Sequence, residues 1–231
     1  MEVHRSLNKE LVSYLDIFRD WSFEKSNWLQ LEKHSLAEKN RRSLNLGGDV
    51  ATSSVYLKDL DHPNHVGYPI ELYGLDLNYE VVRKSGSTWD PDFFNRIREI
   101  NYKTDESLQS YLGAKMSALK AYYPAGGYIS WHTNWNAPGY NIVFTYSQGG
   151  KGYWRHIDPS GSSCLQPDLG KLVHIDDSPG WHCKAGYFGS KENPQNVVWH
   201  SAYTDEPRLS LAYILHDKSI WENLVSEIGE A

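Results

Sequence analysis

The chain has too few cysteines for a disulfide framework. It contains two, Cys164 and Cys183, and they are not arranged as a C-x-x-C motif. Two isolated thiols exclude the class of small secreted domains that depend on several disulfides, and they are typical of proteins in a reducing compartment.

Long apolar runs and an excess of basic residues are also missing. No run approaches the roughly 18 apolar residues of a membrane span, and residues 1–5 open a charged stretch unlike the apolar region of a signal peptide. The formal charge of −6 and the pI of about 5.9 leave no broad basic field to hold a polyanion. We therefore expect a cytoplasmic protein whose partner is neither a membrane nor a nucleic acid.

The 231 residues fit one domain in which helices precede a β-rich region. Apolar periodicity predicts helix over residues 6–45, and Asp90 followed by Pro91 is typical of a helix start. From about residue 117 the pattern becomes β, with turn signals between eight short segments. The predicted strands are 117–123, 127–134, 140–147, 152–158, 171–176, 181–188, 196–202 and 207–215.

Eight short strands in about a hundred residues are the number found in a jelly roll or cupin-like barrel, a double-stranded β-helix. We therefore predict a mainly β fold with flanking helices. Residues 1–116 form a mostly helical N-terminal extension packed on the barrel, 117–216 form the core, and 217–231 form a C-terminal helix.

Polar residues on three of these strands could converge in the barrel. Strand alternation predicts that Tyr128, Ser130, His132 and Asn134 share one face of the second strand. The seventh strand contains His200. On the eighth strand, Arg208 and Ser210 lie on the face opposite their apolar neighbours.

This order of residues resembles the iron(II)/2-oxoglutarate dioxygenases, in particular the prolyl-hydroxylase-like members. That family carries H-x-(D/E) on the second strand, a distal His on the seventh and R-x-S on the eighth. The resemblance covers residues 117–216 and implies that iron(II) is held by His132, Asn134 and His200. It also implies that 2-oxoglutarate is bound by Arg208 and Ser210, with Tyr123 and Asn141 as further candidate contacts.

The expected acidic ligand is missing, because Asn134 stands where the family has Asp or Glu. A neutral amide stabilises a divalent cation less than a carboxylate does. Three interpretations are open: Asn134 is a weak ligand, water or an anion fills the position, or Asp158 supplies the carboxylate. His156-Ile157-Asp158 is itself an H-x-D sequence, but His132 keeps the turn after Tyr123 in its usual place, and Asp158 is followed by Pro159-Ser160-Gly161, as in an ordinary turn.

The implied reaction is hydroxylation of a C–H bond of a peptidyl or small amino-acid-like substrate, using O₂ and releasing succinate and CO₂. The alternative is a cupin-type module that binds a metal or a small anion without turnover. Simpler interpretations exist for single residues: His132 as a core histidine, Arg208 as the ion-pair partner of Asp205 or Glu206, and His174 and His182 as structural residues.

Overall fold

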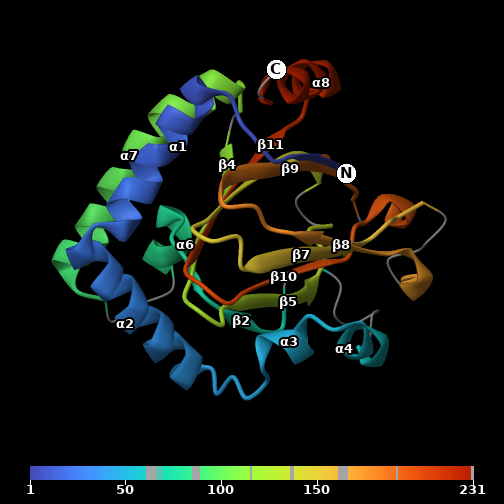
Figure 1. The fold of residues 1–231 in the computed structure, drawn as a ribbon, viewed down its shortest axis with the longest axis horizontal. Coiled ribbons are helices and arrows are strands. Elements are labelled where there is room, and N and C mark those ends of the chain that lie inside the picture. The colour runs from blue at the N-terminus through green and yellow to red at the C-terminus, as the bar shows by residue number, and fades with distance from the viewer. Residues whose placement is uncertain are drawn as a thin grey trace.

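Two antiparallel β sheets face each other, and helices cover their outer faces (Figure 1). The structure is a computed structural model that describes residues 1–60, 67, 69–84, 89–114, 116–135, 138–160, 166–190 and 192–229. Cys164 lies outside these residues.

We call the larger sheet the anion sheet and the smaller one the histidine sheet, after the residues described below. The anion sheet has the spatial order β1 (Glu2–His4), β9 (Gly180–Phe188), β6 (Gly139–Ser147), β11 (Arg208–Leu215), β4 (Met116–Tyr123) and β3 (Leu75–Asp76). The histidine sheet has the order β2 (Leu72–Tyr73), β5 (Tyr128–His132), β10 (His200–Thr204), β7 (Gly152–Ile157) and β8 (Leu172–Asp176).

All eight predicted strands are present, as β4 to β11 in chain order. Consecutive strands mostly alternate between the two sheets, which gives a jelly-roll-like sandwich. The seventh strand begins later than predicted, at His200, because Pro194–Asn196 form a 3₁₀ turn instead. The short strands β1, β2 and β3 were not predicted, and they extend the edges of both sheets.

The helices before the β region are also more divided than the periodicity predicts. The expected helix over 6–45 is two helices, α1 (Lys9–Phe23) and α2 (Lys25–Arg41). Glu24 separates them because its backbone is extended, and its carboxylate accepts hydrogen bonds from the first amides of α2. The predicted start at Asp90 is correct: its side chain caps α7 (Pro91–Leu112).

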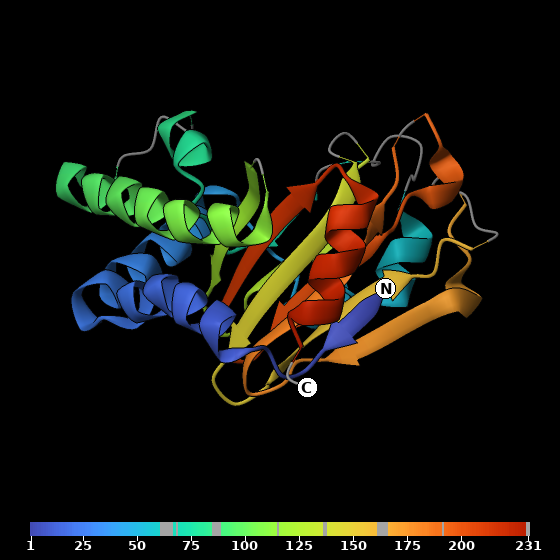
Figure 2. The same ribbon diagram turned by 90° about the horizontal axis from the view of Figure 1, so that it is seen from above.

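Strand alternation on β11 explains how the sandwich separates two cores. Leu209, Leu211 and Tyr213 face outward into a large apolar cluster with α1 and α7, which lie side by side along the anion sheet (Figure 2). The C-terminal helix α8 (Lys218–Glu227), close to its predicted position, adds Trp221 and Leu224 to that cluster. The apolar outer face of the anion sheet is therefore covered by helices, which leaves its inner face for polar residues.

The outer face of the histidine sheet is covered by α3 (Gly48–Ala51) and α4 (Ser54–Asp59) (Figure 1). Leu57 of α4 packs against Trp131, Ile157 and Trp199. A smaller apolar cluster lies between the two sheets, and it contains Ala121, Tyr123, Ile129, Trp154, Phe188, Val198 and Ala202. No helix in the described part of the chain is long and apolar enough to cross a bilayer.

Candidate functional site

Two of the predicted metal ligands meet on the inner face of the histidine sheet. His132 of β5 and His200 of β10 are cross-strand partners, and their ring centroids are 4.1 Å apart. Both side chains are buried. The strand pairing therefore brings together two imidazoles that are 68 residues apart in the sequence (200 − 132).

A β-bulge produces this arrangement and corrects one prediction. Between the pairs His200–His132 and Ala202–Ile129, β5 has one more residue than β10. Ile129 therefore lies on the inner face, as His132 does, and joins the inner apolar cluster, while Tyr128 is paired with Tyr203 on the outer face. The prediction that Tyr128 and His132 share a face is wrong, because simple alternation cannot anticipate a bulge.

Hydrogen bonds orient both imidazoles in the same way. Nδ1 of His132 lies 2.8 Å from the Ser130 carbonyl, and Nδ1 of His200 lies 2.9 Å from the Val198 carbonyl. A carbonyl only accepts, so each Nδ1 carries a hydrogen and each Nε2 is the unprotonated nitrogen that carries a lone pair. A backbone partner on the distal nitrogen is the usual support of a metal-ligating histidine.

Burial keeps these imidazoles neutral. It lowers the pKa of His132 to about 4, and burial together with the neighbouring His132 lowers the pKa of His200 well below its usual value. Metal ions bind the neutral form of histidine, so neither ring has to lose a proton near neutral pH.

Asn134 lies beside this pair. Its Nδ2 is 3.4 Å from Nε2 of His200, where the amide hydrogen faces the imidazole lone pair. A half-turn of the terminal amide exchanges its oxygen and nitrogen. In that orientation the amide oxygen, instead of Nδ2, would lie on the side of Nε2 of His200. The described part of the chain contains no group of three His, Cys, Asp or Glu residues arranged to hold a metal ion. A metal here would thus be held by two imidazoles and a neutral amide.

Of the two alternative ligands, His156 lies beside His200, whereas Asp158 belongs to a turn. His156 of β7 is the cross-strand partner of His200 on the other side, and its Nδ1 is buried without a hydrogen-bond partner. Asp158 is directed into a turn, where its carboxylate accepts from the amide of Ser160 at 2.9 Å and from its hydroxyl at 2.7 Å. Its position is that of a turn residue.

Aromatic rings enclose His200 from the inner cluster. Trp154 stacks on the imidazole with centroids 4.7 Å apart and an interplanar angle of 16°, and Phe188 lies 5.0 Å away. Nε1 of Trp154 is buried and has no hydrogen-bond partner. Such orphaned donors are uncommon in folded proteins and often mark the place of water or a ligand.

Arg208 lies on the opposite wall, on the inner face of the anion sheet. Its Cζ lies 5.6 Å from the ring centroid of Tyr123, its cross-strand partner, which belongs to the same inner cluster as Trp154 and Phe188. Nη1 donates to Ser210 at 2.9 Å, so the two residues share a face as alternation predicts. The hydroxyl of Tyr123 stays protonated, because burial raises its pKa to about 12.

The anion beside Arg208 is one that the sequence did not indicate. Nε of Arg208 donates to Asp177 at 2.8 Å, and both side chains are fully buried. Asp205 and Glu206 are not its partners: Asp205 accepts from Tyr203, and Glu206 accepts from Ser147 and the amide of Gly149. Ordinary ion pairing therefore accounts for part of the environment of Arg208.

His182 and Lys184 complete the group around Asp177. They alternate on β9 and lie 3.0 Å and 3.2 Å from the same carboxylate oxygen. Sequence reasoning treated His182 as structural and overlooked Lys184, although a lysine two residues from a histidine on a buried strand was a usable signal. Asp177 gave no signal, because it follows a strand and precedes Ser178-Pro179-Gly180, as a turn residue would.

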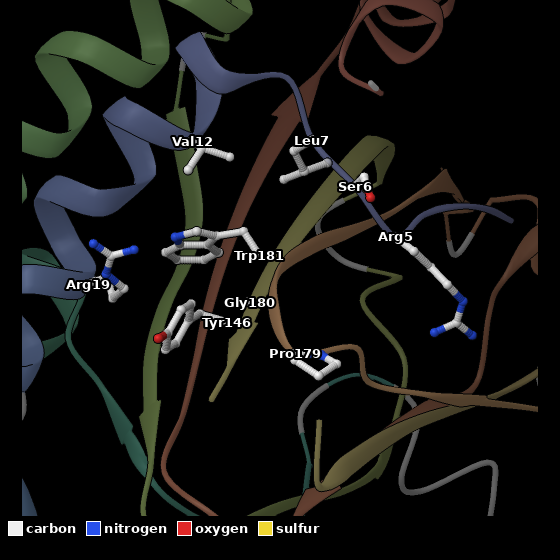
Figure 3. A pocket seen from close by; sticks show the side chains of 9 residues that line it. All are labelled: Arg5, Ser6, Leu7, Val12, Arg19, Tyr146, Pro179, Gly180 and Trp181. Carbon is white, nitrogen blue, oxygen red and sulfur yellow. The ribbon is translucent and has the colours of Figure 1, made fainter. Parts of the chain in front are cut away.

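The remaining predicted residues are not brought to this site. Asn141 uses its amide to donate to the carbonyl of Gly139, and it lies four residues, roughly 13 Å along β6, from Thr145 near Arg208. His174 lies on the outer face, where it accepts from Arg155. A surface pocket of about 300 Å³ is lined by Arg5, Arg19, Tyr146 and Trp181, among others, and by none of the predicted site residues (Figure 3).

No protein-family model and no curated protein matches the chain. The solved structures that are similar to it include the following two. One is a Pseudomonas putida prolyl-4-hydroxylase, 13% identical with a TM-score of 0.35, covering 92% of this chain and 91% of that one. Another is YcfD, a ribosomal oxygenase from Escherichia coli, 14% identical with a TM-score of 0.31, covering 55% of this chain and 30% of that one. The function of this chain is therefore inferred from its own residues.

Proposed function

We propose that this protein is a non-haem iron(II)- and 2-oxoglutarate-dependent oxygenase on a double-stranded β-helix. The observation that carries the proposal is the pair His132 and His200, two buried neutral imidazoles whose rings are 4.1 Å apart and whose Nδ1 atoms are each held by a backbone carbonyl, so that Nε2 carries the lone pair. Polar side chains are rarely buried between two sheets without a ligand or a partner for each atom.

The residues present fit iron, with a weak third donor. His132, His200 and the amide oxygen of Asn134 would hold the ion, and 2-oxoglutarate would place one carboxylate against Arg208 and Ser210. When bound, iron and 2-oxoglutarate would supply the activation of O₂ that hydroxylates a C–H bond and releases succinate and CO₂.

The chain's own residues bind, orient and exclude water. The carbonyls of Ser130 and Val198 fix the two imidazoles, and Arg208 is itself fixed by Asp177. Trp154 and Phe188 shield His200 from solvent. The substrate that we propose, a peptidyl side chain or a small amino-acid-like molecule, follows from the family resemblance alone.

Anaerobic titration of the protein with iron(II) and then 2-oxoglutarate tests the proposal. A weak visible absorption band should appear only when both are present, and admission of O₂ should release succinate. If iron binds tightly but 2-oxoglutarate produces neither the band nor succinate, the protein is instead a metal-binding module without turnover.

Asn134→Asp should tighten iron(II) binding by about tenfold or more, because a carboxylate adds a negative charge beside the cation. Calorimetry or competition with a chelator measures this affinity. Asp158→Ala is the matched control and should change it little, since that carboxylate is directed into its own turn. The reverse pattern, with a large loss in Asp158→Ala, would identify Asp158 as the acidic ligand.

A further inference from the structure

Four ionisable side chains are buried together on the inner face of the anion sheet: Asp177, His182, Lys184 and Arg208. We call them the Asp177 cluster. Their side chains are at most 2% exposed. One carboxylate accepts from all three bases: Oδ2 from Arg208, and Oδ1 from His182 and Lys184.

The charges in this cluster do not balance. Burial lowers the pKa of His182, so its imidazole is neutral, and Arg208 and Lys184 then contribute two positive charges against the single negative charge of Asp177. An uncompensated charge in a buried position is costly unless an anion meets it. The cluster thus lacks one negative charge.

Lys120, the other buried lysine in the described part of the chain, shows the opposite balance of charges. Lys120 of β4 lies 2.8 Å from Asp105, and Asp76 also faces it, so one amine has two carboxylates nearby. Among the described residues, Lys184 has one carboxylate partner, Asp177, which it shares with the guanidinium of Arg208. A purely structural lysine would resemble Lys120 rather than Lys184.

Several donors of the Asp177 cluster also lack a protein acceptor. Arg208 has five N–H groups, and three of them donate hydrogen bonds, to Asp177, Ser210 and Thr145. The hydroxyl of Thr145 lies 3.4 Å from both Arg208 Nη2 and Lys184 Nζ, so the two cations are directed to one place.

We infer that Lys184 and Arg208 together bind a carboxylate of a small dicarboxylate, with Asp177 as the internal anion that positions both cations. This inference rests on the proposed function in that the dicarboxylate there is 2-oxoglutarate. It adds Lys184 as a binding residue that the R-x-S pattern does not contain. It also explains why Arg208 keeps free N–H groups although it already has a buried partner.

Lys184→Met, which keeps the apolar stem and removes the charge, tests this inference. In the iron-loaded protein without O₂, it should weaken 2-oxoglutarate binding by about tenfold or more and leave iron affinity unchanged, because charge-assisted hydrogen bonds are lost. Binding of 2-oxobutyrate, which lacks the distal carboxylate, should not change. Equal weakening of both keto acids, or no weakening of either, would overturn the inference.

Stability separates a binding role from a structural one. Without ligand, Lys184→Met should be as stable as the wild type or more so, because Arg208 and Asp177 then balance each other. The matched control Lys120→Met should be less stable, because it leaves Asp105 and Asp76 without their cation. If Lys184→Met unfolds as readily as Lys120→Met, Lys184 is a structural residue.

A metal-free measurement keeps the inference distinct from the oxygenase proposal. Glutarate should raise the melting temperature of the wild type in the presence of a chelator, and it should not do so for Lys184→Met. If glutarate has this effect but iron and 2-oxoglutarate give no band, the dicarboxylate site stands and the oxygenase proposal fails. If glutarate has the same effect on both proteins, or on neither, the inferred site is wrong.

Discussion

His200→Ala should abolish measurable iron(II) binding. His200 is the central residue of the site, since it is paired with His132 on one side and His156 on the other. Loss of a residue that only supports a ligand costs roughly 10- to 100-fold in metal affinity, so loss of the ligand itself should cost at least about 100-fold. Equilibrium dialysis with metal analysis measures the bound iron, and cobalt(II) can replace iron where oxidation interferes.

Two further histidines provide controls for this variant. His156→Ala removes another buried ring from the neighbouring strand β7, and His174→Ala removes a ring from the outer face. Both should bind iron as the wild type does, whereas His132→Ala should behave like His200→Ala. If His156→Ala loses the metal and His132→Ala retains it, the second ligand comes from β7 instead of β5.

The strands and the main groups of the site could be predicted from the sequence because they depend on local patterns. Turn residues delimit the eight strands, and alternation correctly places Arg208 and Ser210 on one face. His132 and His200 come together because the second and seventh strands of a jelly roll are neighbours, as β5 and β10 are here.

What could not be predicted depends on long-range pairing. The bulge in β5 results from how its residues pair with β10, and a period of two gives no sign of it. The edge strands β1 and β3 are only three and two residues long, and they form because the sheet offers an edge. The partner of Arg208 lies 31 residues earlier in a turn, where an aspartate is ordinary.

Asp177 illustrates how that unforeseen partner affects stability. Burial alone would raise the pKa of this carboxylate, yet the charges of Arg208 and Lys184 and the hydrogen bond from His182 keep its pKa below the usual value. The ionised form is therefore stabilised in the folded protein more than in the unfolded chain. By linkage, this stability is fully present above the unfolded pKa of about 3.9 and is lost as the pH falls through the lower folded pKa.

Asp177→Asn should accordingly lower the free energy of unfolding by about 3 kcal/mol at neutral pH, because it leaves two buried cations without a counter-ion. Urea denaturation measures the change. Asp176→Asn, the same substitution at the neighbouring exposed residue, should stay within about 0.5 kcal/mol of the wild type. The difference between wild type and Asp177→Asn should be constant down to about pH 5 and should shrink below about pH 4.

The double variant Asp177→Asn/Lys184→Met decides whether charge imbalance causes this loss. Removing Lys184 as well leaves one buried cation instead of two, so the double variant should be more stable than Asp177→Asn alone, and the two effects should not add. Additive losses would mean that each side chain stabilises the fold independently, and the excess positive charge would then have no energetic role. Recovery would show that Lys184 is destabilising without an anion, as expected for a cation that is retained to bind a ligand.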